Sequence, residues 1–229
     1  MTEASFFKTS IGKKQIVAAT GLLLILYLIV HLAGNLFIYA GPYVFNGYAD
    51  KLHSLRPFLY VVEYGLLFVF LIHMYFTVWV VLENINARQK KYAVYQPVGE
   101  RSLATRLMPY TGTFLFSFIV WHLLDFTFMD QGGPRSIVSN GISLGIYGVV
   151  YNSFREPLHS AGYILARGCL GLHLSHGTQS FFQTFGFNHP RYTPLISKIS
   201  NALGFLIAFG FSTIPVYVLI DSAKYKIGF

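Results

Sequence analysis

Residues 15–35 read QIVAATGLLLILYLIVHLAGN, an apolar run without a single Asp, Glu, Lys or Arg. A transmembrane helix needs about 20 mainly apolar residues, and the uncharged sequence here continues as far as residue 49. The apolar region of a signal peptide is only about 7–15 residues long and ends at a cleavage site. The stretch therefore predicts a retained first membrane helix that holds His31 inside the bilayer.

The composition of the 229 residues points to the same class of protein. Hydrophobic residues make up 54% of the chain and charged residues 11%, whereas soluble domains carry about 25% charged residues. This excludes a soluble cytosolic enzyme, a disordered chain and a fibrous protein. The single cysteine, Cys169, cannot form an internal disulfide, an iron–sulfur cluster or a cysteine-based zinc site.

The net charge of +8 comes from basic residues at the ends of the apolar runs. This placement indicates membrane topology and lipid contact, and no binding of nucleic acid. Ten lysines and arginines on one side against six on the other favour a cytoplasmic N-terminus and a C-terminus outside.

The predicted fold is an all-α membrane protein, with residues 1–229 as one integral-membrane domain of five transmembrane helices. The longest connection, residues 130–156, contains the uncharged but polar residues 136–154. That part predicts a surface-lying or re-entrant loop, with a sixth span as the alternative. The predicted helices cover residues 16–40, 58–82, 108–129, 157–185 and 196–220.

Each of the first four predicted helices contains a histidine close to its middle. Ionisable residues in a membrane are costly and usually functional, although hydrogen bonding between helices is the alternative explanation. Because successive helices run in opposite directions, the histidines fall into two layers, about 3–6 Å from the midplane. The outer layer holds His31 and His122, and the inner layer holds His73 and His173.

Two layers of paired imidazoles suggest two stacked metal centres. Two histidines without a carboxylate or thiolate are an incomplete zinc site, but they are a complete axial pair for a haem. With both axial positions filled, such a haem transfers electrons and does not bind oxygen. The four histidine-bearing helices are thus predicted to form a haem-binding bundle.

An internal repeat accompanies the histidines. The dipeptide TG at residues 20–21 precedes His31 by the same spacing as TG at residues 111–112 precedes His122. Ten residues of helix span about 15 Å, so Gly21 and Gly112 are expected at the inner layer, where they leave room for a porphyrin. Close helix packing through small residues is the alternative, and the same two explanations apply to Gly168, Gly171 and Gly177.

These motifs resemble one known family along essentially the whole chain. They are ATGL followed by VHLAGN around His31, LIHMYF around His73, YTGTF followed by VWHLLD around His122, and GLHLSHGTQSF around His173. The chain resembles the di-haem cytochrome b membrane anchor of succinate dehydrogenases and fumarate reductases, of the type with five helices in one polypeptide. The resemblance implies that His31 and His122 ligate an outer (distal) haem b, and that His73 and His173 ligate an inner (proximal) one. By the same resemblance, His176 is not a haem ligand and has a structural or supporting role next to His173.

The resemblance also implies partners and a location. The expected partners are a flavoprotein subunit with FAD and an iron–sulfur subunit, which together carry out the succinate or fumarate chemistry. The expected substrate of the anchor is menaquinone or another quinone, and the expected location is the lipid of the bacterial cytoplasmic membrane. The basic residues between Arg88 and Arg106 suit either a docking surface for the partners or an ordinary positively charged cytoplasmic loop.

Polar residues outside the four histidines give candidates for quinone and proton chemistry. A proton-exchanging carboxylate is expected near the distal haem, and a solvated surface charge is the alternative for each candidate. Arg167 lies inside the fourth predicted helix, where a buried guanidinium needs an anionic partner such as a haem propionate or Asp125. The candidates for the quinone and proton site are Asp125, Asp50, His53 and Glu63.

Two other classes of function remain open from the sequence. One is a di-haem cytochrome b anchor of another respiratory enzyme, such as a nitrate reductase or a formate dehydrogenase. The other is a haem-free transporter or scaffold that uses its histidines as polar contacts or as a proton relay. The direction of catalysis and the oligomeric state are left open.

Overall fold

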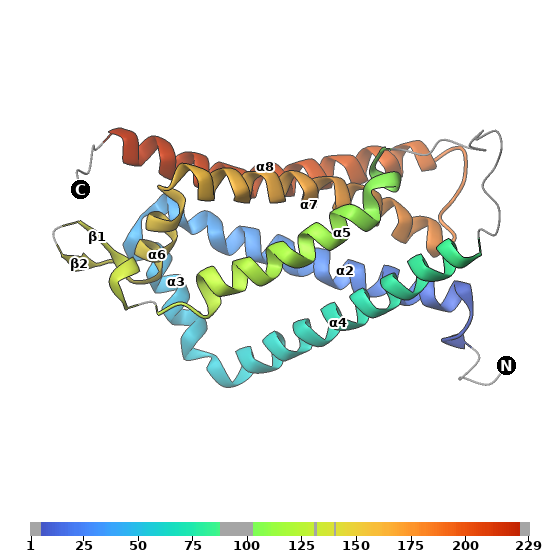
Figure 1. The fold of residues 1–229 in the computed structure, drawn as a ribbon, viewed down its shortest axis with the longest axis horizontal. Coiled ribbons are helices and arrows are strands. Elements are labelled where there is room, and N and C mark those ends of the chain that lie inside the picture. The colour runs from blue at the N-terminus through green and yellow to red at the C-terminus, as the bar shows by residue number, and fades with distance from the viewer. Residues whose placement is uncertain (1–5, 88–102, 131, 140, 225–229) are drawn as a thin grey trace.

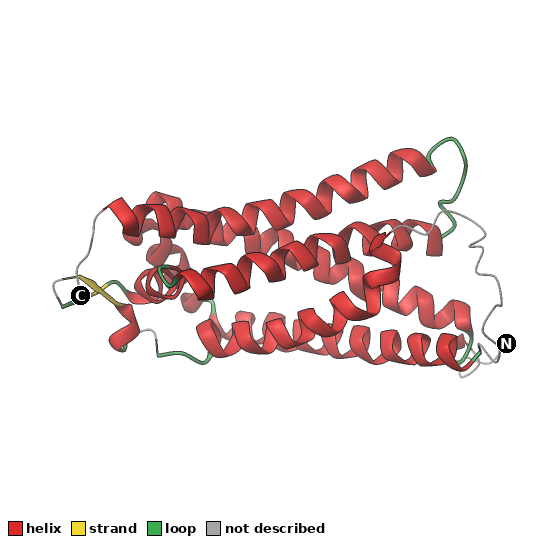
Figure 2. Cartoon of the chain, turned by 45° about the horizontal axis from the view of Figure 1, so that its top comes forward, coloured by secondary structure: helices red, strands yellow, loops and turns green. Residues whose placement is uncertain are grey.

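The computed structural model describes residues 6–87, 103–130, 132–139 and 141–224. They form an elongated bundle of helices, with a small hairpin at one end (Figure 1, Figure 2). The long helices follow the long axis and alternate in direction, so that α2 begins at one end and α8 ends at the other. The α-helices of the described part are α2 (Ser10–Asn35), α3 (Pro42–Ser54), α4 (Arg56–Asn86), α5 (Leu103–His122), α6 (Gly145–Phe154), α7 (Pro157–Thr184) and α8 (Thr193–Lys224).

We call the end where α2 begins the near end, and the end that carries α3, α6 and the hairpin the far end (Figure 1). All five predicted long helices are present in the described residues. Four segments are long and apolar enough to cross a membrane: Ser10–Ala40, Arg56–Asn86, Arg106–Thr127 and Thr193–Lys224. The chain is therefore all-α apart from the hairpin and has the character of a multi-pass membrane protein.

Helix α7 is as long as the others but is not among these four. It packs against α2, α5, α6 and α8, and it contains Arg167 and three histidines. A helix that is covered by its neighbours needs no continuous lipid-facing surface, so it can carry polar and small residues. Its position inside the bundle explains why its apolar character is weaker.

The segment after α2 differs from the predicted outer loop. A short 3-10 helix (Leu36–Ala40) continues α2, and Gly41 then adopts a φ of 86°. Glycine tolerates this left-handed conformation at little cost. Pro42 occupies the first turn of α3, where its fixed φ suits a helix start. The Gly-Pro pair thus ends one helix and begins another, so that Asp50 and His53 lie on a helix.

Helix α4 is attached to the bundle mainly through α2, and none of its residues is buried. At the near end, the buried ammonium group of Lys13 on α2 pairs with Glu83 on α4. It also lies 4.6 Å from the centre of the Trp79 ring, whose Nε1 donates to Glu83 at 2.9 Å. This cluster joins α2 to α4 at the near end.

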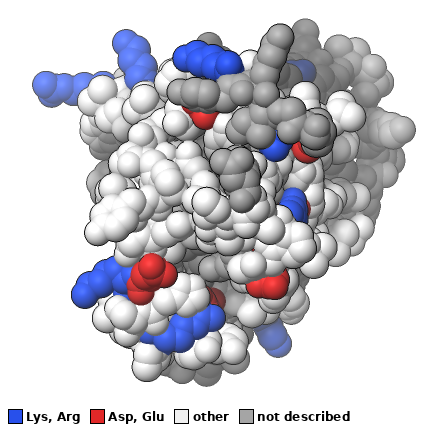
Figure 3. Space-filling view, turned by 90° about the vertical axis from the view of Figure 1, so that its left-hand side faces the viewer, with Lys and Arg blue, Asp and Glu red and all other residues white. Residues whose placement is uncertain are grey.

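The far end is closed by the connection between α5 and α7. It contains a 3-10 turn (Pro134–Ser136), strands β1 (Ile137–Ser139) and β2 (Ile142–Ser143), and the short helix α6. Most of α6 is buried against α3, α7 and α8. Figure 3 views this end and shows charged side chains around a broad uncharged surface. The predicted loop of residues 136–154 is therefore largely a hairpin and a packed helix.

Two contacts hold α6 in place. The side chain of Asn46 on α3 accepts from the backbone N–H of Tyr147 at 3.0 Å and donates to the carbonyl of Leu144 at 2.8 Å. Gly148 lies so close to the preceding turn that a Cβ at this position would be 2.0 Å from the carbonyl oxygen of Ser136. Only glycine allows the helix to pack at this distance.

Helix α6 also bonds to the end of α8. The Tyr151 hydroxyl donates to the Asp221 carboxylate at 2.8 Å. Burial, followed by this hydrogen bond, raises the pKa of Tyr151 well above its usual range, and burial raises the pKa of Tyr147 to about 12. Both phenols are therefore neutral at physiological pH, and Tyr151 acts as a donor.

The packing of Gly148 generates a test. We expect Gly148→Ala to lower the stability by about 1–3 kcal/mol, because the added methyl group meets backbone that cannot rotate away. Gly47→Ala is the matched control, since nothing lies within 4 Å of a Cβ there, and alanine favours a helix by up to about 1 kcal/mol. Thermal unfolding of the two purified variants in detergent, compared with the unmodified chain, measures the difference. Equal melting temperatures for the two variants would contradict the packing described here.

Candidate functional site

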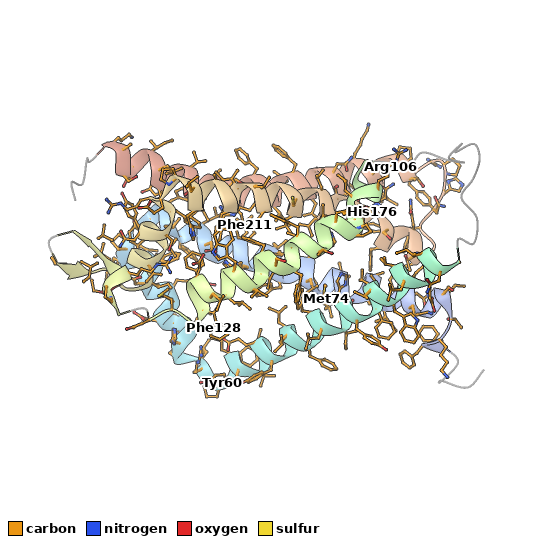
Figure 4. All side chains as sticks on the ribbon, in the orientation of Figure 1. Tyr60, Met74, Arg106, Phe128, His176 and Phe211 are labelled. Carbon is orange, nitrogen blue, oxygen red and sulfur yellow. The ribbon has the colours of Figure 1, made fainter. Side chains whose placement is uncertain are left out.

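The first histidine pair lies towards the far end. The rings of His31 on α2 and His122 on α5 have centroids 5.9 Å apart and are nearly perpendicular, at 83°. Phe211 reaches from α8 to within 5.7 Å of the His31 ring, and Phe118 lies 5.9 Å from the His122 ring (Figure 4). The Nδ1 atom of His122 is buried and has no hydrogen-bond partner in the described part of the chain.

The second pair lies towards the near end. His73 on α4 and His173 on α7 interact electrostatically, and each has a threonine at its Nδ1 atom. Thr20 Oγ1 lies 3.0 Å from Nδ1 of His73, and Thr111 Oγ1 lies 3.2 Å from Nδ1 of His173. The structure thus brings His31 and His122 together, as their depths predicted, and it places His73 and His173 each beside a TG dipeptide of another helix.

The glycines of the two TG dipeptides face the histidines of the second pair. A Cβ at Gly21 would be 3.3 Å from Cε1 of His73, and a Cβ at Gly112 would be 3.5 Å from Cε1 of His173. Gly171, in contrast, packs against α8, where a Cβ would meet the Gly204 carbonyl at 3.0 Å. For Gly171 the alternative explanation, close helix packing, is the one that the contacts support. A Cβ at Gly168 or Gly177 would meet nothing within 4 Å.

A π-helical turn, Leu123–Thr127, follows His122 directly. The N–H of Phe128 donates to the carbonyl of Leu123 at 3.0 Å, five residues earlier. Such wide turns are rare and occur frequently at functional sites. The turn contains the buried carboxylate of Asp125.

Asp125 is the centre of a polar cluster between α5, α7 and the far-end turn. The buried hydroxyl of Tyr163 donates to its carboxylate at 2.8 Å, and His159 Nε2 lies 3.2 Å from the same oxygen. Arg135 reaches the other oxygen at 3.5 Å and donates to Ser153 at 3.0 Å. Tyr163 also contacts His122, with ring centroids 6.1 Å apart, so the cluster is continuous with the first histidine pair.

Arg167 lies on the other side of Tyr163. It is 7% exposed, and its Nη1 atom has no hydrogen-bond partner among the described residues. Its guanidinium packs on the rings of Phe154, Tyr163 and Phe211 at 5.2, 5.3 and 5.9 Å, and it interacts electrostatically with His31 and His122. Asp125 pairs with Arg135 instead, so the alternative of an Arg167–Asp125 pair is wrong.

The other three carboxylate and histidine candidates lie away from this cluster. Asp50 and His53 are exposed on α3, and Glu63 is exposed on α4. Glu63 pairs with Arg56 at 3.4 Å. Asp50 lines a groove of about 740 Å³ between α3 and the start of α6. Of the four candidates for a proton site, only Asp125 is buried next to a histidine pair.

Three members of the cluster were not among the predicted site residues: Tyr163, His159 and Arg135. Their positions in the sequence, 10 to 38 residues from Asp125, give no periodic signal. His159 and Tyr163 reach Asp125 from α7, and Arg135 reaches it from the turn Pro134–Ser136. The sequence shows the TG dipeptides as a repeat, but it does not predict that their threonines contact histidines.

In the described part of the chain, the paired histidines suit the two axial positions of a haem iron better than a metal site with three or more protein ligands. No group of three or more His, Cys, Asp or Glu side chains that could hold a metal ion occurs in the described ranges. A metal–imidazole bond is about 2 Å long, so two axial rings on one iron have centres roughly 6 Å apart, close to the spacing of the first pair. Nδ1 of His122 and Nη1 of Arg167, both without a hydrogen-bond partner among the described residues, also fit a haem with its propionate groups.

The expected basic docking surface lies mostly outside the described residues. Four of its basic residues fall outside the described ranges: Arg88, Lys90, Lys91 and Arg101. Arg106 is described, and it is exposed at the near end, at the start of α5.

Comparison with known proteins gives no match: no family model, no curated protein and no solved structure matches this chain.

The Asp125 cluster generates a stability test. We expect Asp125→Ala to lower the stability by about 1–3 kcal/mol, because it leaves the buried Tyr163 hydroxyl and the Arg135 guanidinium without their acceptor. Asp50→Ala serves as the control, since Asp50 is exposed and surface changes usually cost no more than about 0.5 kcal/mol. Thermal unfolding in detergent compares the two. A variant at residue 125 as stable as the control would contradict a bonded role for this carboxylate.

Proposed function

We propose that the chain is the membrane anchor and electron-transfer subunit of a succinate:quinone oxidoreductase, that is, of a succinate dehydrogenase or fumarate reductase. In this proposal, residues 1–229 are a single cytochrome b domain that crosses the membrane five times, with α7 as the fifth, interior crossing. One observation carries the proposal. Four helices bring four histidines into two pairs, one above the other, within an otherwise apolar bundle.

His31 and His122 would hold one b haem, and His73 and His173 a second. Bound there, the two haems would supply one-electron transfer between the two ends of the bundle. The protein contributes the axial nitrogens, the aromatic walls of Phe118 and Phe211, and one compensating charge. The Arg167 guanidinium, buried beside the first pair without a carboxylate, is the group that would bind a haem propionate.

The far end is the proposed place of quinone chemistry. Reduction or oxidation of a quinone, such as menaquinone, takes up or releases protons as well as electrons. The Asp125 carboxylate lies in a cluster continuous with the first histidine pair, and Arg135, which is 34% exposed, connects it with the surface. Asp125 would hold the exchanged proton, with His159 and Tyr163 positioning it. Asp50, His53 and Glu63, all exposed, are weaker candidates.

The proposed orientation puts the near end in the cytoplasm and the far end outside the bacterial cytoplasmic membrane, so the first pair is the outer, distal one. The flavoprotein and iron–sulfur subunits would dock at the near end, where Arg106 is exposed. FAD and iron–sulfur clusters belong to those subunits, because this chain has only Cys169. The dicarboxylate reaction would therefore take place outside this chain.

The first test is a reduced-minus-oxidised spectrum of the purified complex, with haem measured per polypeptide. We expect two b-type haems. His31→Ala should remove the outer haem and His73→Ala the inner one, because each variant removes one axial ligand. Arg167→Met should weaken retention of the outer haem alone, and Arg56→Met, which changes an arginine whose side chain is 40% exposed, is its control. A preparation without haem would reject the proposal and favour a haem-free transporter or scaffold.

The second test addresses the quinone site. We expect Asp125→Asn to lower succinate-dependent reduction of quinone by about 100-fold, a typical contribution of a positioned acid or base. Electron transfer from succinate to a water-soluble dye that accepts electrons at the flavoprotein should be unchanged. Asp130→Asn, the same change at an exposed carboxylate, should affect neither rate. Unchanged quinone reduction in the Asp125 variant, with both haems present, would move the proton site elsewhere.

A further inference from the structure

Each TG dipeptide contacts one of the inner histidines, and in both cases the histidine lies on a different helix. Thr20 and Gly21 on α2 contact His73 on α4, and the equivalent pair on α5 contacts His173 on α7. The same arrangement thus occurs twice in one chain, with α2 related to α4 as α5 is related to α7. The outer pair lacks this arrangement: the Asn35 amide lies 3.4 Å from both ring nitrogens of His31, and Nδ1 of His122 has no partner in the described residues.

The hydrogen bonds of the Thr20 hydroxyl define its direction. A hydroxyl group has one proton to donate. Oγ1 of Thr20 lies 2.7 Å from the carbonyl oxygen of Ile16 and 3.1 Å from that of Val17. Two oxygen atoms approach to 2.7 Å favourably only when a proton lies between them, so the short contact directs the hydroxyl proton to the Ile16 carbonyl. The lone pairs of Oγ1 then face His73 at 3.0 Å, and the ring nitrogen Nδ1 must carry the proton of that bond.

The same reasoning applies to the second copy. Thr111 Oγ1 lies 3.1 and 3.2 Å from the carbonyl oxygens of Leu107 and Met108. This Oγ1 also lies 3.2 Å from Nδ1 of His173, and we assign it the acceptor role by analogy with Thr20. In both rings the proton lies on Nδ1, and the lone pair is left on Nε2.

We propose that Thr20 and Thr111 are positioning residues that fix His73 and His173 as the Nδ1–H tautomer and so make Nε2 the metal-binding atom of each. This rests on the proposed function, because it assumes that the inner pair binds a haem. A second hydrogen bond orients a ligating imidazole and raises its basicity. The adjacent glycines leave room for the ring edge beside each threonine. The threonines do not touch the iron and act through the histidines.

The test removes each hydroxyl while keeping the shape of the side chain. Thr20→Val, Thr111→Val and the double variant are compared with Thr20→Ser and Thr111→Ser, which keep the hydroxyl group. Thr113→Val is the matched control on α5, because the exposed Thr113 donates to the Pro109 carbonyl at 3.0 Å and its hydroxyl has no contact with a histidine. The measurements are the rate of haem loss to excess apomyoglobin in detergent and the midpoint potential of each haem.

We expect the valine variants to lose the inner haem about tenfold faster, the lower end of the usual effect of removing such a partner. The inner midpoint potential should shift to more positive values, because a less basic imidazole stabilises the oxidised iron less. The outer haem should be unchanged and serves as an internal reference, and the serine variants should behave like the unmodified chain. If the threonines acted in helix packing alone, the valine variants would leave the inner midpoint potential unchanged, and serine would have no loss to rescue.

The outcomes separate this inference from the proposed function. An unmodified complex with two haems, whose inner haem is indifferent to both valine substitutions, overturns the role of the threonines and leaves the proposed function intact. If one valine variant fails to assemble, the other valine variant and the serine pair decide the result. An unmodified chain that binds no haem overturns both.

Discussion

A histidine in an apolar helix must find its partner inside the bundle, because lipid offers no hydrogen bonds. The arrangement of this chain follows from that constraint. His73 and His173 are satisfied by threonines of neighbouring helices, and His31 and His122 meet each other. These contacts join α2 to α4, α2 to α5, and α5 to α7. The polar residues therefore specify which helices are neighbours, a choice that apolar contact between similar helices makes only weakly.

The same constraint explains the unusual character of α7. It carries the buried Arg167 as well as Tyr163 and His173, and it packs against four other helices. A lipid-facing helix with these residues would be costly, whereas a covered helix can direct them to partners. Helix α4 is the opposite case. None of its residues is buried, and its polar contacts to α2, through Lys13 and His73, are correspondingly important for its attachment.

The far end shows how a connection can build a site. The hairpin and α6 place Arg135 against Asp125, while the π-helical turn directs that carboxylate towards Tyr163 and His159 on α7. The buried pair of Arg167 and Tyr163 then links the cluster to the first histidine pair. The proposed proton site and the proposed outer ligand pair thus share side chains, so that a change in one is expected to be felt by the other.

The sequence by itself determined the long helices, because apolar runs of this length have one stable form in lipid. It also determined the two histidine layers, because depth follows from position along a helix of known rise. The tertiary structure decided the rest. Three features depend on packing between segments far apart in the chain. The threonines of the repeat contact histidines of other helices, Asp125 turns towards α7, and residues 36–54 and 145–154 form helices. Hydropathy records how apolar a segment is, and it contains no information on which side chain of another helix will face it.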